Sequence, residues 1–226
     1  MDFFVSIIAL VFLLPFLLPV VVALKLTGEG EIWYFQDRVG YKSEIFKIWK
    51  FATMVKDSPN LGSGSLTVRN DPRVTTLGKY LRISKINELP QVINVLLGDM
   101  SIVGPRPQVL CDFEVYSEQV KKHINDVKPG ITGIGSIVFR DEEKLMSSTK
   151  MPVKEFYANE IAPYKGYLEL WYLNNISFKT DLILVFLTAW SIISPESNLV
   201  YSLFPSLPEK PLSLRLEAGT SVHTNL

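Results

Sequence analysis

The apolar residues of this chain gather in one long run and several short ones, and their spacing predicts most of the elements. Residues 3–24 form a run of about 22 mostly apolar positions without a charge, which is long enough for a helix to cross a bilayer. Pro15 and Pro19 interrupt this run, and each removes a helical hydrogen bond. A straight spanning helix, a signal peptide and a re-entrant helix broken at the prolines are therefore the three interpretations.

The signal peptide is the weakest of these, because the run lacks a basic leading region and a small-residue cleavage site. A spanning helix is the default for a run of this length. The two prolines favour the re-entrant helix, which would leave both ends of the run on one face of the membrane.

Shorter patterns predict the rest of the chain. Residues 32–35 and 45–51 read as two strands around a turn, which predicts a β-hairpin. Apolar residues at helical spacing follow Pro90, a favoured residue at a helix start. Residues 182–193 form a helix too short to span, so it is buried or lies on the bilayer surface.

These patterns predict one α+β domain, mostly helical, with a small β-hairpin and amphipathic interfacial helices, built on an N-terminal Pro-broken re-entrant membrane helix. We expect the membrane helix over residues 1–24 and the folded domain over 25–200. The last part, 201–226, carries prolines and little periodicity, so we expect a loosely ordered tail.

Composition indicates a membrane-associated protein and gives no sign of nucleic-acid binding or of an intrachain disulfide. Hydrophobic residues make up 47% of the chain and the mean hydropathy is +0.20, which is high for a purely soluble domain. Lys+Arg and Asp+Glu both total 23, so charge gives no sign of a nucleic-acid partner and we expect none. Cys111 is the single cysteine, which excludes an intrachain disulfide.

Candidate chemistry is concentrated between Arg82 and Pro107. Arg82 and Lys85 offer donors suited to phosphate oxygens, and a helix start after them favours anions. Residues 104–107 read Gly-Pro-Arg-Pro, a stiff turn that holds Arg106 between two prolines. On residue types alone, a helix with solvated charged ends and a capping Glu88 is the more common explanation of such a segment.

The order of the blocks SKINELPQ, GDMS and GPRP resembles the bacterial sugar transferases, which are polyprenyl-phosphate phosphoglycosyl transferases. The resemblance extends over residues 2–195 through KFATM, DPR and KPGITG blocks and through the spacing of Asp2 and Pro15. Four features depart from the family pattern. Asn87 stands where the family has the Asp of an Asp-Glu pair, and Ala52 replaces an arginine. Leu14 stands where the family often has Ser before the proline, and the usual Lys-Arg before Asp2 is missing.

The resemblance implies transfer of a sugar-1-phosphate from a nucleotide-sugar donor, usually a UDP-sugar, to a polyprenyl phosphate acceptor, with release of UMP. It also implies Mg²⁺ as cofactor and a catalytic domain on the cytoplasmic face of the inner membrane. Assembly into a homo-oligomer is compatible with the resemblance. The residues agree, because joining two anionic substrates at a membrane needs a cationic cleft and oxygen ligands for a hard metal. No P-loop or Ser-His-Asp pattern competes.

The family motifs assign roles to particular positions. Glu88 is expected to act in the chemistry or as a metal ligand, and Asn87 to hydrogen-bond a phosphate oxygen. The residues expected to bind substrate are Arg38, Lys50, Arg73, Arg82, Arg106 and Arg140.

Because an amide cannot serve as the family's carboxylate nucleophile, three outcomes follow. Glu88 takes that role, or the lipid phosphate attacks directly, or the protein is inactive. We favour an active enzyme, since Glu88 and the other blocks are intact. A membrane-bound binding or scaffold protein that has lost catalysis is the alternative.

Overall fold

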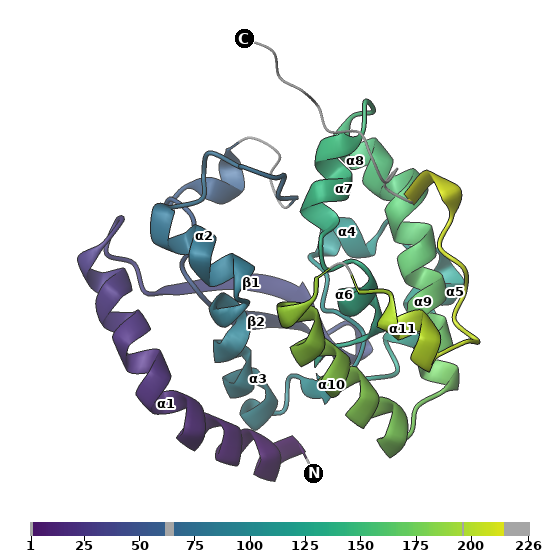
Figure 1. The fold of residues 1–226 in the computed structure, drawn as a ribbon, viewed down its shortest axis with the longest axis horizontal. Coiled ribbons are helices and arrows are strands. Elements are labelled where there is room, and N and C mark those ends of the chain that lie inside the picture. The colour runs from purple at the N-terminus through teal and green to yellow at the C-terminus, as the bar shows by residue number, and fades with distance from the viewer. Residues whose placement is uncertain (1, 62–65, 196, 215–226) are drawn as a thin grey trace.

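The computed structural model describes residues 2–61, 66–195 and 197–214, and within them the fold is α+β and mostly helical (Figure 1). Two small two-stranded sheets accompany the helices. The elements run in the order α1 (Asp2–Leu26), β1 (Trp33–Val39), η1 (Tyr41–Ser43), β2 (Ile45–Phe51), η2 (Ser58–Asn60), α2 (Thr76–Ile83), η3 (Ile86–Gln91), α3 (Val92–Leu97), β3 (Ser101–Val103), α4 (Leu110–Phe113), α5 (Glu118–Ile124), β4 (Gly130–Thr132), α6 (Ile134–Val138), α7 (Glu142–Ser148), α8 (Val153–Phe156), η4 (Tyr157–Ile161), α9 (Ala162–Asn174), α10 (Phe178–Ile193), α11 (Leu199–Leu203) and η5 (Leu212–Leu214).

Helix α1 is the predicted apolar run, and its helical assignment continues through both prolines. A break at the prolines is therefore not confirmed. Within the described residues, α1 is the one helix long and apolar enough to cross a membrane. Most of its side chains face outward, whereas Leu17 and Leu24 pack against Phe51 and Leu81 of the domain. Figure 1 shows α1 along the lower left edge and α10 at the lower right.

The predicted hairpin is confirmed. Strands β1 and β2 pair antiparallel in a register that runs from Trp33↔Phe51 to Val39↔Ile45. Successive side chains of a strand point to opposite faces of the sheet. Tyr34 and Lys50 are therefore partners on one face, and both line the cleft described below.

The segment after α2 begins differently from its prediction. Lys85 has a positive φ of 61°, which ends the helical path, and a 3₁₀ turn, η3, contains Pro90. Helix α3 starts only at Val92. It ends at Gly98, whose φ of 89° is a conformation that glycine adopts without strain. The η3 turn therefore carries Asn87 and Glu88 on irregular backbone.

A parallel strand pair lies beneath the Gly-Pro-Arg-Pro turn, and the sequence did not predict it. Strand β3 pairs with β4, with Ser101 opposite Gly130 and Val103 opposite Thr132. The amide of Gly104 donates to the carbonyl of Thr132 at 2.9 Å. The amide of Gly130 donates to the carbonyl of Pro105, also at 2.9 Å. The KPGITG block is thus the support of the turn that presents Arg106.

The largest hydrophobic core surrounds α9, and part of the expected loose tail belongs to it. Val200, Phe204, Leu207 and Leu214 are buried in this core. The prediction of a loosely ordered segment from residue 201 is therefore wrong up to residue 214. Burial of a few well-spaced apolar side chains outweighs the weak local propensity of a proline-rich segment. The remaining part of the predicted tail lies outside the described residues.

The buried end of this segment gives a direct stability test. Replacing the fully buried Leu214 with Ala should lower the free energy of unfolding by about 2–5 kcal/mol, because it leaves a cavity in the core. Leu212, in the same turn, is 79% exposed, so Leu212→Ala is the matched control. Denaturant unfolding in detergent measures both. Equal effects of the two substitutions would show that the segment does not pack as described.

Candidate active site

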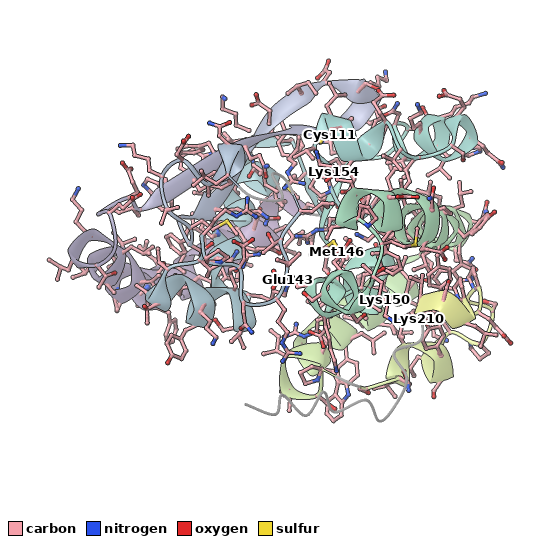
Figure 2. All side chains as sticks on the ribbon, turned by 90° about the horizontal axis from the view of Figure 1, so that it is seen from above. Cys111, Glu143, Met146, Lys150, Lys154 and Lys210 are labelled. Carbon is pink, nitrogen blue, oxygen red and sulfur yellow. The ribbon has the colours of Figure 1, made fainter. Side chains whose placement is uncertain are left out.

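A large cleft separates the hairpin and α2 from α6, α7 and the Gly-Pro-Arg-Pro turn. Its volume is about 1670 Å³, which is roomy compared with the roughly 300–1,000 Å³ of ordinary ligand pockets. Cys111, Glu143 and Met146 line it, and Figure 2 shows them near the middle of the molecule, where its N-terminal and C-terminal halves meet. The cleft thus has room for a substrate as large as a nucleotide-sugar.

Glu88 lies in this cleft between two cations. Its Oε1 accepts hydrogen bonds from Lys50 Nζ at 3.1 Å and from Arg106 Nη2 at 2.7 Å. Oε2 lies 3.4 Å from Arg106 Nη1, which makes Oε2 the less tightly held oxygen. Lys50 comes from β2, Glu88 from η3 and Arg106 from the turn, so three distant segments meet at one carboxylate. The structure therefore brings together three of the residues that the motifs singled out.

Burial alone would raise the pKa of Glu88, but Arg106 and Lys50 outweigh it and hold that pKa well below its ordinary value. Burial lowers the pKa of Lys50 to about 7, with Glu88 opposing the shift and Arg106 adding to it. Glu88 raises the pKa of Arg106 above its ordinary value. Glu88 is thus a fully ionised carboxylate at neutral pH, whereas Lys50 titrates there.

Arg38 extends the cationic surface next to Arg106. Its Nη1 donates to the carbonyl of Pro107 at 3.0 Å, and its Nη2 donates to Gln36. Burial and the neighbouring Arg106 lower the pKa of Arg38 to about 10, so it stays charged at neutral pH. Lys85 also lines the cleft, and burial lowers its pKa. The cations around Glu88 therefore carry more positive charge than its one carboxylate neutralises. This excess suits a substrate with several phosphate charges.

Asn87 is buried beside Glu88 and lines the cleft. Its Oδ1 has no hydrogen-bond partner among the described residues. A buried amide oxygen without a partner costs free energy, which is recovered when a ligand supplies one. The position of Asn87 is therefore consistent with contact to a ligand.

Arg82 and Arg140, two of the expected substrate-binding arginines, contact other elements at the wall of the cleft. Arg82 forms an ion pair with Glu143 at 2.5 Å on the cleft wall. Arg140 donates to Ser191 and to the carbonyl of Ile83, both at 3.3 Å, and so connects α10 with α2 at the cleft rim. Both remain lining residues of the cleft.

Arg73 is placed differently from its prediction. It is 5% exposed, and its guanidinium bonds to Asp71 and to the carbonyls of Ser58, Leu61 and Leu66. These bonds occupy its donors within the loop, so the structure assigns Arg73 to holding that loop. The DPR block gave no sign of this, because the carbonyls that it binds lie in a separate segment.

A second set of buried charges lies behind Arg106, and the sequence reasoning missed it. Lys165 is buried and donates to both carboxylate oxygens of Glu142 at 2.7 Å. One helical turn further along α9, Glu169 is also buried, and burial raises its pKa to about 8. The four-residue spacing of Lys165 and Glu169, which places both on one face of a helix, was the available signal for this pair.

The described residues hold no group of three or more His, Cys, Asp or Glu side chains placed around a metal ion. Two oxygen atoms nevertheless remain for a hard cation, namely the unpaired Asn87 Oδ1 and the less tightly held Glu88 Oε2. Mg²⁺ is often bound by one or two protein oxygens together with substrate phosphates. The residues therefore fit a Mg²⁺ ion that arrives with a phosphate-bearing ligand.

The chain is similar to several known proteins. Residues 1–195 match the family model described as bacterial sugar transferase. The exopolysaccharide production protein PSS of Rhizobium leguminosarum bv. phaseoli is 34% identical over 195 residues, covering 84% of this chain and 92% of the relative. A UDP-glucose:undecaprenyl-phosphate glucose-1-phosphate transferase of Klebsiella pneumoniae is 33% identical over 192 residues, covering 84% of this chain and 38% of the relative.

An undecaprenyl-phosphate glucose phosphotransferase of Komagataeibacter xylinus is 37% identical over 153 residues, covering 62% of this chain and 29% of the relative. The chain thus spans nearly the whole Rhizobium relative but less than half of the two larger transferases. The family model covers most of the chain, including the Lys50–Glu88–Arg106 cluster. The chain therefore belongs to the bacterial sugar transferase family.

Proposed function

We propose that this protein is a phosphoglycosyl transferase that moves a sugar-1-phosphate from a UDP-sugar to a polyprenyl phosphate and releases UMP, at the start of glycan or polysaccharide assembly. Family membership supports the reaction class, and the names of the Klebsiella and Komagataeibacter relatives support the donor and the acceptor. The observation that carries the proposal is Glu88, held ionised between Lys50 and Arg106 in a large cationic cleft.

In this reaction the bond between the two donor phosphates breaks, and the sugar-bearing phosphorus forms a bond to an acceptor oxygen. Both substrates are anions, so they repel each other unless cations lie between them. Arg106, Lys50 and Arg38 supply that positive charge next to the reacting phosphates. Binding the donor adds negative charge beside Lys50, which raises its pKa and keeps it protonated.

Residue 87 and Glu88 decide how the phosphorus is attacked. The amide of Asn87 is no nucleophile, and Glu88 already neutralises two cations, which weakens it as a nucleophile. We therefore favour direct attack by the lipid phosphate, with Asn87 hydrogen-bonding a phosphate oxygen and Glu88 positioning the cations.

Mg²⁺ is proposed as the cofactor, with Asn87 Oδ1 and Glu88 Oε2 as its protein oxygens. When bound, it would neutralise charge that develops on the leaving phosphate. The protein contribution is to hold both oxygens on the rigid η3 turn.

Helix α1 is proposed to enter the membrane from one face and to leave both of its ends there. Ser101 donates to Asp2 at 2.6 Å at one end, and the amide of Lys56 donates to Glu29 just beyond the other. Both ends therefore contact the same folded domain, which a perpendicular spanning helix would not allow. We place the domain on the cytoplasmic face of the inner membrane, where UDP-sugars are available.

The cleft rim explains how a lipid could reach the site. Ile83 and Ile193 line the cleft and are 63% and 77% exposed, at the ends of α2 and α10. Helix α10 also exposes Phe178, Leu182 and Phe186 on its outer side. An apolar rim next to Arg140 suits a polyprenyl chain whose phosphate enters the cationic cleft.

The proposal is tested by measuring UMP release from a panel of UDP-sugars, with polyprenyl phosphate and Mg²⁺ in nanodiscs. Release that requires the acceptor, and that stops on chelation, is expected. Release from the donor alone would indicate a covalent enzyme intermediate in place of direct attack. No release from any donor by the folded protein would favour the scaffold alternative.

Replacing Glu88 with Gln should lower turnover by about 10²-fold or more, because it removes the carboxylate that pairs with both Lys50 and Arg106. The measurement is UMP release at saturating donor. Glu114, whose ion pair with Lys121 lies at the surface, gives the control Glu114→Gln, which should keep full activity. Full activity of Glu88→Gln would remove Glu88 from the mechanism.

The membrane path of α1 is tested by cysteine labelling in intact cells, in a Cys111→Ser background. Cysteines at Phe3 and Thr27 should both react only with a reagent that enters the cytoplasm, since both ends of α1 contact the domain. Labelling of one position from outside would show that α1 spans the membrane.

A further inference from the structure

A second polar cluster lines the cleft, and the proposed reaction does not use it. Lys165 of α9 donates to both carboxylate oxygens of Glu142 in α7 at 2.7 Å. Its Nζ also lies over two aromatic rings, 5.2 Å from the ring centre of Phe139 and 5.3 Å from that of Tyr157. These four residues, the Lys165 cluster, all line the cleft. They come from four separate segments, so the fold holds the ammonium group in one place.

The two charges of the Lys165 cluster balance each other. The Lys165 side chain is 5% exposed, and that of Glu142 is 21% exposed. A buried ammonium group needs such a partner, and the pair carries no net charge. Around Glu88, by contrast, three cations act on one carboxylate. The cleft therefore has a cationic part that favours phosphate and, at the Lys165 cluster, a polar part whose own charges cancel.

Glu142 keeps hydrogen-bonding capacity towards the cleft. An ionised carboxylate has about four lone-pair sites, and Lys165 takes one on each oxygen. Because the Glu142 side chain is partly exposed at the cleft wall, its remaining sites are open to a ligand. A group that meets Glu142 must offer O–H or N–H donors, since an anion would be repelled.

Two hydroxyl groups beside this pair have no hydrogen-bond partner within the part of the chain that the structure describes. They are the buried oxygens of Tyr157 and of Ser136 in α6, and both residues line the cleft. Tyr157 is 3% exposed and opens the π-helical turn η4, a rare conformation that is frequent at functional sites. A buried hydroxyl without a partner costs free energy, which a ligand recovers by supplying one.

A carboxylate acceptor next to two hydroxyl groups fits a ring that carries several hydroxyl groups. Each hydroxyl of a sugar can donate to Glu142 and can accept from Tyr157 or Ser136. Uracil offers a single N–H donor, and an ionised phosphate group offers none. A site built to bond hydroxyl groups also rejects rings that lack them, because its own polar groups are then left unpaired.

The Lys165 cluster acts on the cations that would bind the donor phosphates. Glu88 raises the pKa of Arg106, and Glu142 and Tyr157 add to that shift. Arg106 lines the same cleft as the cluster. In a nucleotide-sugar the sugar is bonded directly to a phosphate group, so the two must be bound side by side. A phosphate at Arg106 and a sugar at the Lys165 cluster meet this requirement.

We propose that Glu142, Tyr157 and Ser136 form the subsite for the sugar ring of the nucleotide-sugar donor. The two hydroxyl groups and the carboxylate bond the sugar hydroxyls, and Lys165 is a positioning residue that orients the Glu142 carboxylate. The inference deepens the proposed function and rests on it for the class of donor.

Two substitutions remove the unpaired hydroxyls and little else. Tyr157→Phe and Ser136→Ala should each weaken binding of the best-bound UDP-sugar about threefold to tenfold, because one hydrogen bond is lost. Affinity for UDP, which carries no transferable sugar, should stay unchanged. Isothermal titration calorimetry in nanodiscs measures both, with UDP-glucose, UDP-galactose and UDP-N-acetylglucosamine as the sugar probes.

Two results of this titration would overturn the inference. Unchanged UDP-sugar affinity in both variants would show that neither hydroxyl meets the sugar. An equal loss of affinity for UDP would assign the cluster to the ribose of the nucleotide instead.

Stability separates a ligand-binding hydroxyl from a structural one. Tyr172 is as deeply buried as Tyr157, but its hydroxyl donates to Asp181 at 2.9 Å, so Tyr172→Phe is the matched control. Without ligand, Tyr157→Phe should not lower the melting temperature, whereas Tyr172→Phe should lower it and leave UDP-sugar binding unchanged. Equal losses of stability in the two variants would give the Tyr157 hydroxyl a structural role and contradict the inference.

Glu142→Gln keeps the shape of the side chain and removes its charge. UDP-sugar binding should weaken about tenfold, because a carboxylate accepts from hydroxyl groups more strongly than an amide does. UDP affinity should not fall, since losing a negative charge near Arg106 does not disfavour an anion. Glu118→Gln, which breaks a surface ion pair with Lys121, is the control for loss of a carboxylate. A parallel fall for UDP and UDP-sugar would contradict a sugar subsite.

Failure of the proposed function is distinguishable from failure of this inference. UMP release by the wild type, together with unchanged UDP-sugar affinity in the variants, would overturn the inference alone. Selective loss of UDP-sugar affinity in a protein that releases no UMP would support the subsite and overturn the proposed reaction. Absence of UDP-sugar binding by the folded wild type would overturn both.

Discussion

The structure depends on one partly buried carboxylate, Glu88, whose charge is balanced by two cations from elsewhere in the chain. Removing Glu88 from water is unfavourable unless Lys50 and Arg106 compensate for it, and neither lies near it in sequence. The hairpin must therefore bring Lys50 to the η3 turn, and the Gly-Pro-Arg-Pro turn must bring Arg106 there. Lys85 also acts on Glu88, in addition to Lys50 and Arg106. Three cationic groups thus surround one carboxylate, so this part of the cleft keeps an excess of positive charge for an anionic substrate.

Rigidity of the Arg106 turn follows from contacts on several sides. Its glycine and first proline bond to β4 beneath it, and its last carbonyl accepts from Arg38. Two prolines limit the backbone between these contacts. A short irregular segment can hold an arginine in place only when its backbone groups are satisfied in this way.

Sequence alone predicted the elements whose signals are local. The apolar run, the alternating hairpin and the motif residues Glu88 and Arg106 could be found because period and residue order identify them. The β3–β4 pair could not, since three-residue strands carry almost no period and their pairing is between distant segments. Arg73 was misjudged because most of the groups that it binds are carbonyls of residues 58–66, which no motif marks. The tail to Leu214 was misjudged because its order comes from tertiary burial.

The apolar surfaces of the protein lie at one rim of the cleft, which would let a lipid acceptor and a soluble donor enter it from different sides. Both ends of α1 contact the domain, and the ends of α2 and α10 place exposed isoleucines at the cleft rim. A lipid phosphate that entered from this rim would first meet Arg140 and then the cluster around Glu88. The side of the cleft lined by the hairpin would stay free for the water-soluble donor. If the two anions arrive from different sides, the excess positive charge acts on both at once. In bulk water the same attraction would be screened.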